Sequence, residues 1–172
     1  MRSSRPSRLP SLRLLGLDPG LIATGYGLLE FGPGQLSVVA TGVVTSDAAK
    51  PLERRLQQIY DGVGALLAEH APSTVVIEDV YSEYKFPRTA IQMAHARGVI
   101  CLAAQQRGIT VMTLPPASVK RAVAANGAAS KSQVQASVTR HLRLATPPRP
   151  SHVADALALA LTGFWRIGGR LP

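Results

Sequence analysis

Residues 13–20 read RLLGLDPG, and this stretch decides the fold. An apolar run of strand length ends in the carboxylate of Asp18, and a Pro-Gly pair then turns the chain before a second apolar run at residues 26–31. Asp18 is therefore predicted to lie at the carboxyl end of a central strand. Such an Asp often does no more than accept hydrogen bonds from the turn, so its role depends on which residues join it.

Two more carboxylates lie in apolar surroundings. Glu78 closes the apolar run at residues 75–77, and Asp155 lies inside a helix rich in alanine and leucine. Buried charges are costly unless something compensates them, and a divalent metal ion compensates all three carboxylates at once. The sequence therefore predicts a metal site made by Asp18, Glu78 and Asp155.

His152 precedes Asp155 by three residues and therefore shares its helix face. Ser151 is expected to cap this helix, which places both side chains near a helix start, where backbone dipoles favour anions such as a scissile phosphate. We expect His152 to ligate a metal, move a proton or stabilise developing charge. A surface or packing role is the alternative for a histidine at such a position.

Hydrophobic periodicity predicts an α/β fold built on a five-stranded mixed sheet. Strands are expected at residues 12–18, 25–31, 36–45, 74–78 and 109–114. Helices are expected at residues 52–70, 88–107, 118–126, 130–142 and 151–167. Short connections make the first three strands antiparallel, and the two later strands are expected to be parallel, with the fourth beside the first. Helices then cover both faces of the sheet, and Asp18 and Glu78 converge at one edge.

The length and apolar content predict one domain, at residues 12–167. Residues 1–11 are rich in Arg, Ser and Pro and are expected to form a disordered basic arm, although organelle transit segments share this composition. Residues 168–172 are expected to form a flexible tail. The single cysteine fits a reducing compartment, and no apolar run approaches the ~20 residues of a membrane helix, so we expect a cytoplasmic protein without membrane contact.

The net charge of +9 is unevenly distributed along the chain. Residues 84–154 contain no Asp or Glu, but they contain many basic residues: Lys85, Arg88, Arg97, Arg107, Lys120, Arg121, Lys131, Arg140, Arg143 and Arg149. Such a field favours a polyanionic partner, and nucleic acid is the first expectation. Solvated basic surface without a partner is the alternative.

The helix predicted at residues 88–107 carries small residues near one stripe: Ala90, Ala94, Gly98 and Cys101. Packing of the helix on the sheet is the ordinary reason for such a stripe. A subunit interface is the alternative.

Five segments in order resemble the RuvC-type Holliday junction resolvases, which are crossover junction endodeoxyribonucleases with a ribonuclease H-like fold. They are LDPG (17–20) with TGYG (24–27), IE (77–78), HARG (95–98), KSQV (131–134) and HVADALA (152–158). The resemblance covers residues 14–165. Each motif alone is weakly specific, but their order and spacing together are strongly specific.

The resemblance implies a site and a set of partners. The acidic cluster of the family falls on Asp18, Glu78 and Asp155, and His152 takes a fourth place that is Asp in some members and His in others. The DNA contacts of the family fall on Tyr81, Lys120 and Lys131, and the basic field adds Lys85 and Arg88 as expected DNA contacts. The implied cofactor is Mg²⁺, with two ions per site and Mn²⁺ as a substitute. The implied partners are a four-way DNA junction, a second copy of the chain in a homodimer, and a branch-migration motor.

Three alternatives remain open from the sequence. A sugar-kinase or actin-like ATPase has a similar Asp-x-Gly turn, here at residues 18–20, but needs a second domain and another glycine-rich loop. A catalytically silent junction-binding protein would need the basic field without the carboxylates. Another ribonuclease H-like nuclease, acting on RNA, would share the metal chemistry.

Overall fold

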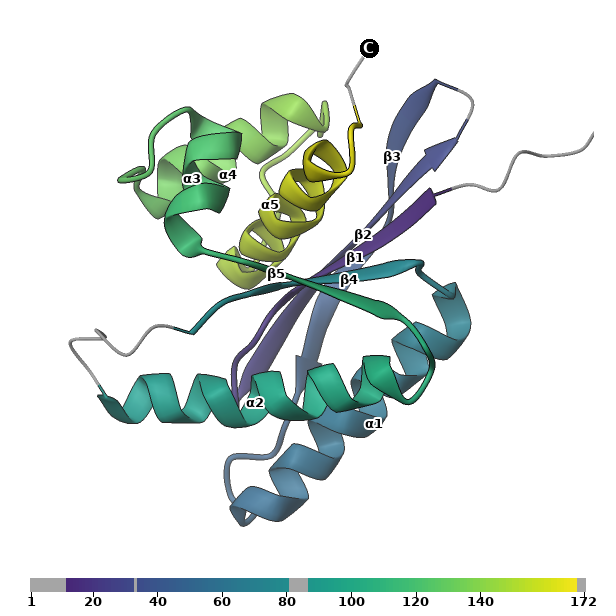
Figure 1. Cartoon of the computed structure of the whole chain (residues 1–172). Coiled ribbons are helices and arrows are strands. Elements are labelled where there is room, and N and C mark those ends of the chain that lie inside the picture. The colour runs from purple at the N-terminus through teal and green to yellow at the C-terminus, as the bar shows by residue number, and fades with distance from the viewer. Residues whose placement is uncertain (1–11, 33, 81–86, 170–172) are drawn as a thin grey trace, which may run out of the picture.

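The computed structural model describes residues 12–32, 34–80 and 87–169. Within these ranges five strands form one sheet in the order β3-β2-β1-β4-β5. They are β1 (Leu12–Asp18), β2 (Ala23–Gly32), β3 (Gln35–Thr45), β4 (Thr74–Glu78) and β5 (Thr110–Leu114). The helices of the same ranges are α1 (Leu52–His70), α2 (Pro87–Gln105), α3 (Pro116–Ala124), α4 (Lys131–His141) and α5 (Ser151–Arg166). Figure 1 shows α1 and α2 on one face of the sheet and α3, α4 and α5 on the other.

Strand β1 lies at the centre of the sheet. It pairs antiparallel with β2, so that Asp18 is opposite Gly25, and parallel with β4, so that Leu17 is beside Ile77. Strand β2 pairs antiparallel with β3, and β4 pairs parallel with β5. The predicted mixed sheet, with three antiparallel strands followed by two parallel strands and helices on both faces, is confirmed.

Most element bounds follow the sequence pattern closely. Strands β1 and β4 and helix α1 begin and end at the predicted residues, and the other bounds differ from the predictions by at most two residues. Clear breakers explain this agreement, since Pro72 follows α1 and Gly108, at φ +65°, follows α2. No helix of the described ranges has both the length and the apolar character that crossing a bilayer requires.

Two cores lie on opposite faces of the sheet. Leu15 and Leu17 of β1 are fully buried against α1 and α2, whereas Leu14 is fully buried in the core that contains α5. Because side chains alternate along a strand, Gly16 and Asp18 belong to the face that α5 covers. The alternation of β1 thus directs the first carboxylate toward α5.

Helix α5 lies against the backbone of β1 and β2 where these strands carry glycine. A Cβ atom on Gly16 would lie 1.9 Å from the carbonyl oxygen of Ala156, and one on Gly25 would lie 2.2 Å from that of His152. A Cβ on Gly27 would lie 2.6 Å from Cδ2 of Leu157. Only glycine permits this close approach, which fixes the start of α5 beside the carboxyl end of β1.

The expectation that Ser151 caps α5 is wrong. The N-cap residue is Pro150, with extended backbone at φ −64° and ψ 177°, and no side chain caps the helix. Proline fixes the backbone just outside the helix, so Ser151 becomes the first helical residue. His152 and Asp155 remain within the first two turns, so their shared face is unaffected.

The small residues of α2 do not form the face that packs on the sheet. Ala94 and Gly98 are exposed, and a Cβ on Gly98 would meet nothing within 4 Å. Ala96 and Ile100 are fully buried against the sheet instead. The packing interpretation of this stripe is therefore wrong for its two central residues, because the buried stripe runs along an adjacent face of the helix.

Candidate active site

Asp18 and Glu78 end the two parallel strands at the middle of the sheet. Alternation along β4 places Glu78 on the face of Val76, which packs in the same core as Leu14. Both carboxylates therefore lie on the α5 side of the sheet, at neighbouring strand ends. The side chain of Asp18 is only 14% exposed.

The turn that follows Asp18 is held by Thr24. Its hydroxyl donates to the carbonyl oxygen of Gly20 at 3.0 Å and accepts from the Gly20 amide at 3.3 Å. Thr24 is fully buried, so this contact is shielded from water. The turn is thereby fixed directly beside the first carboxylate.

Helix α5 brings His152 and Asp155 to the two strand carboxylates. The Nδ1 group of His152 donates to Oδ2 of Asp18 at 2.7 Å. Asp18, Glu78, His152 and Asp155, together called the quartet, line one cleft of about 970 Å³. The structure therefore brings to one cleft all four residues that the sequence predicts for the catalytic and metal site, but it does not group three of them around a single point.

The cleft also has a cationic wall. Lys120 of α3 and Lys131 of α4 line it, and Lys131 Nζ lies 3.7 Å from Oδ2 of Asp155. The start of α4 is fixed by a capping box, in which the side chains of Ser130 and Gln133 each bond the other's backbone. Two of the lysines predicted to contact DNA therefore lie beside the quartet.

Burial makes the carboxyl group of Glu78 an unusually weak acid. Burial, with smaller contributions from the negative charges of Asp18 and Asp155, raises the pKa of Glu78 from 4.5 to about 7. Lys120 and Lys131 act in the opposite direction. Near neutral pH Glu78 therefore exchanges a proton readily in the protein without metal.

The other two shifts in the quartet have related causes. The hydrogen bond to Asp18 raises the pKa of His152, whereas partial burial opposes this rise. Burial raises the pKa of Asp155, the charge of Asp18 adds to that effect, and Lys131 opposes it. The carboxylates thus repel one another in a partly desolvated space, which is the situation that added positive charge relieves.

The donor set of the quartet fits hard divalent ions. Within the described ranges, no three His, Cys, Asp or Glu side chains are grouped closely enough to hold one metal ion. Magnesium accepts one or two carboxylates and completes its shell with water and phosphate oxygens, so pairs of quartet residues suffice. The mutual repulsion of the three carboxylates supports this assignment, because ions would remove it.

Several residues that line the cleft were not indicated by the sequence. They include the uncharged α2 residues Thr89, Gln92 and Met93, together with Pro116 and Val119 of α3. Only the position of α2 directly after the loop that follows β4 could have suggested the first three. Tyr81 and Lys85, both predicted to contact DNA, lie outside the described residues.

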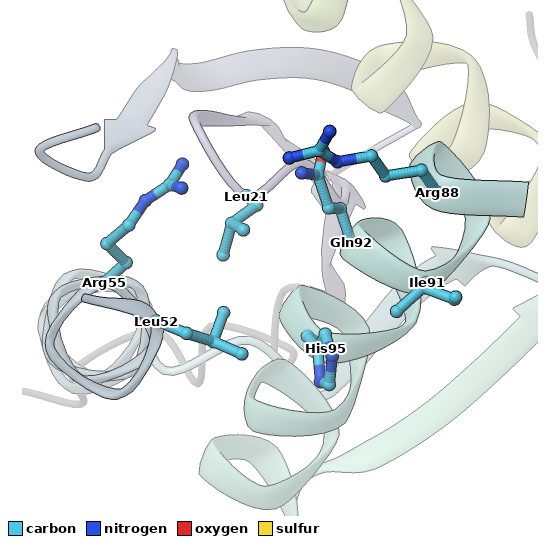
Figure 2. Close-up of a pocket in the computed structure, with 7 residues that line it drawn as sticks. All are labelled: Leu21, Leu52, Arg55, Arg88, Ile91, Gln92 and His95. Atoms are coloured by element: carbon cyan, nitrogen blue, oxygen red, sulfur yellow. The ribbon is translucent and has the colours of Figure 1, made fainter. Parts of the chain in front are cut away.

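Arg88 lies at a second hollow instead of the cleft. This hollow has a volume of about 420 Å³ and lies between α1, α2 and the turn after β1 (Figure 2). Its walls carry Leu21, Leu52, Arg55, Arg88, Ile91, Gln92 and His95. Leu21 and Gln92 line both spaces, so the hollow adjoins the cleft.

Comparisons with known proteins agree on one family. A family model described as "Crossover junction endodeoxyribonuclease RuvC" matches residues 14–163. The protein of that name from Salinispora arenicola is 45% identical over 160 residues, which cover 92% of this chain and 91% of the relative. The one from Rhodopirellula baltica is 42% identical over 152 residues, which cover 88% of this chain and 85% of the relative.

A solved structure supports the same conclusion. It is described as T. thermophilus RuvC in complex with Holliday junction substrate, and it superposes with a TM-score of 0.82 at 33% sequence identity. The match covers 91% of this chain and 96% of that chain. The fold class expected from the sequence is thereby confirmed.

Proposed function

Because the chain belongs to the RuvC family of crossover junction endodeoxyribonucleases, we propose that it resolves four-way DNA junctions by paired, symmetric nicks. The observation that carries this proposal is the quartet, which faces a cleft with a lysine wall. Symmetric nicks leave two duplexes that can be ligated, as recombination and repair require. Family membership decides against a sugar-kinase or actin-like ATPase.

The quartet would hold the metal ions of this reaction. Asp18, Glu78 and Asp155 offer carboxylate oxygens, and we propose two Mg²⁺ ions, with Mn²⁺ as a substitute. When bound, such ions activate water and stabilise the charge that develops on the phosphate. His152 orients the Asp18 carboxylate through its Nδ1 bond, and the same bond raises the pKa of its ring.

The DNA backbone would follow the cationic wall of the cleft. We propose that Lys120 and Lys131, which line the cleft, bind phosphates next to the scissile bond, and that Arg88, which lines the adjoining hollow, binds phosphates further along the backbone. From the charge pattern of the sequence, Lys85 would add to this field, and from the resemblance, Tyr81 would stack on bases near the crossover. Contacts to phosphates would supply most of the affinity, and base contacts would supply selectivity at the cut.

We also propose that the protein acts as a homodimer. A junction with two-fold symmetry is cut symmetrically when two copies of one site are related by a two-fold axis. Helix α2 offers a surface for this contact, since Ile91 and Leu102 are 57% and 50% exposed and Ala94 and Gly98 lie exposed between them. A branch-migration motor as a further partner rests on the family resemblance, whereas the proposed cytoplasmic location rests on the cysteine content of the sequence.

The proposed activity is tested with a synthetic mobile four-way junction. Wild-type protein with Mg²⁺ is expected to produce paired nicks, and Asp18→Asn is expected to bind the junction but to cut at least about 100-fold more slowly, since it loses a metal-binding charge. Linear duplex and an RNA–DNA hybrid of the same sequence are the control substrates. Preferential cutting of the hybrid, or equal cutting by both proteins, would contradict the proposal.

The dimer is tested by placing charge on α2. Ile91→Glu combined with Leu102→Glu is expected to convert a dimer to a monomer in sedimentation experiments and to abolish paired nicking, because two like charges would face each other across the axis. Ile167→Glu, at a similarly exposed position after α5, is the matched control. A dimer that survives the double substitution would place the interface elsewhere.

A further inference from the structure

Arg97 of α2 holds the end of β4 through three contacts. Its Nε group donates to the carbonyl oxygen of Glu78 at 3.2 Å, and its Nη2 group donates to Oγ1 of Thr113 at 3.0 Å. The same Nη2 atom lies 3.8 Å from Oδ1 of Asp79. One guanidinium therefore links α2 to the last residue of β4, to the residue after it and to β5.

The Glu78 carbonyl needs this donor because the sheet does not supply one. The amide of Asp79 donates to Leu114 of β5, so the carbonyl of the same peptide unit, that of Glu78, points toward β1. Continuing the β1–β4 register past Leu17 and Ile77 makes Pro19 the residue that faces this carbonyl. Proline has no N–H group, so the ladder ends here and Arg97 takes its place.

Arg97 acts from the side of the sheet opposite to the Glu78 side chain. Thr113 lies two residues after Val111 on β5 and therefore shares its position on the face that α1 and α2 cover. The side chain of Glu78 lies on the opposite face, which α5 covers. Arg97 is not among the residues that line the cleft, and its side chain is 28% exposed. It thus contacts the backbone of Glu78 without reaching the space in which the reaction would occur.

We infer that Arg97 is a positioning residue that fixes the direction of the Glu78 carboxylate by holding its backbone carbonyl and the adjoining Asp79 in place. The inference rests on the proposed nuclease function. A carboxylate that binds a metal must be positioned within a few tenths of an ångström. Removing a residue that holds such a ligand in place typically lowers activity or metal affinity about 10–100-fold. Arg97 belongs to the HARG segment, for which the proposed chemistry of the cleft gives no other role.

The experiment separates positioning from simple attraction of DNA. Single-turnover cutting of the four-way junction at saturating protein is measured beside junction affinity without metal. Arg97→Gln is expected to slow cutting about 10–100-fold and to leave the affinity within about twofold. Arg97→Lys is expected to remain at least about fivefold slow, because one ammonium group cannot replace both bonds of the fork.

Thr113→Val provides a test without any change of charge. Thr113 is exposed and lies in a strand, where valine is well tolerated, so the variant is expected to fold normally. It is expected to cut about two- to fivefold more slowly, and the double variant with Arg97→Gln is expected to be no slower than Arg97→Gln alone. Arg107→Gln is the matched control. Arg107 follows the far end of α2, and its guanidinium donates to the carbonyl oxygen of Ala103. This variant is expected to cut at the wild-type rate.

A second readout does not depend on cutting. Magnesium is expected to raise the Tm of the wild type and to raise that of Arg97→Gln by less, because metal binding stabilises only a correctly formed site. Full activity of Arg97→Gln, full rescue by Arg97→Lys, or a loss confined to junction affinity would each overturn the inference. If the wild type cuts no junction, the proposed function itself fails, whereas an active wild type with an equally active Arg97→Gln removes only the role of Arg97.

Discussion

At the scale of single residues, the quartet concentrates negative charge and balances part of it within the chain. Asp18 accepts a hydrogen bond from His152, and Asp155 lies near Lys131. Glu78 differs, because burial and the two other carboxylates raise its pKa to about 7. Glu78, together with His152 and Asp155, whose pKa values are also raised, therefore makes the stability of the metal-free protein depend on pH.

We expect the free energy of unfolding of the metal-free protein to fall as pH rises from about 5 to 8. The folded protein holds the Glu78 proton up to about pH 7 and the unfolded chain only to 4.5, so the folded state loses its relative advantage across this interval. Glu78→Gln removes the charge and should be more stable than the wild type at pH 8 by about 1–3 kcal/mol. Urea unfolding in chelator at several pH values measures both effects.

The control for this prediction is Glu53→Gln, at an exposed position in the first turn of α1. It should leave the pH dependence of the wild type unchanged. Parallel pH profiles for Glu78→Gln and the wild type would show that Glu78 is not the group responsible.

At the scale of elements, the contact between α5 and the glycine-bearing strands determines where the quartet lies. The start of α5 can reach Asp18 only because Gly25 presents no side chain to His152. Two of the four quartet residues come from this helix, and two come from the strands beneath it. The geometry of the site is thus a property of how one helix packs on the sheet.

We expect Gly25→Ala to displace the start of α5. The added Cβ would lie 2.2 Å from the His152 carbonyl oxygen, which belongs to backbone and cannot move aside alone. A loss of about 1–3 kcal/mol in stability is expected from such overpacking, together with a loss of junction cutting of at least about tenfold. Thermal unfolding and single-turnover cutting measure the two effects.

Gly32→Ala on the same strand is the matched control, because a Cβ there would meet nothing within 4 Å. It should change stability by no more than about 0.5 kcal/mol and leave cutting unchanged. If Gly25→Ala were equally harmless, the close approach of α5 would not control the site.

The sequence predicted elements better than it predicted contacts. Apolar runs that end at a carboxylate, a proline or a glycine located β1, β4 and α1, and the predicted parallel pairing of the fourth strand beside the first correctly brought Asp18 and Glu78 to one edge. The contact of Gly25 with α5 could not be predicted, because a glycine within a strand gives no indication of which element approaches it. The prediction that Ser151 caps α5 was wrong, because Pro150 is the N-cap residue and Ser151 is the first residue of the helix.

At the scale of the whole molecule, residues far apart in the chain combine opposite charges in one space. Lys120 and Lys131 come from the stretch without Asp or Glu, yet they line the same cleft as Asp18. The charge pattern along the sequence therefore predicted that the DNA-binding surface is positively charged. Only the fold shows that Lys120 and Lys131 lie beside the carboxylates of the quartet. A polyanion can bind there once the carboxylates are neutralised by metal.

We expect junction binding to depend steeply on salt, and less steeply after removal of this wall. Lys120→Gln combined with Lys131→Gln should weaken binding and reduce the slope of log affinity against log salt by about two, at roughly 0.9 for each lost phosphate contact. Arg166→Gln, an exposed charge at the opposite end of α5, should leave the slope unchanged. Equal slopes for all three proteins would show that the DNA follows another path.

The glycine contacts of α5 also separate stability from catalytic geometry. At Gly16 and Gly25 the main chain of the strands rests on the main chain of α5, so backbone contact sets the distance between helix and sheet there. We therefore expect substitutions deeper in the two cores to change heat resistance more than they change the spacing of the carboxylates.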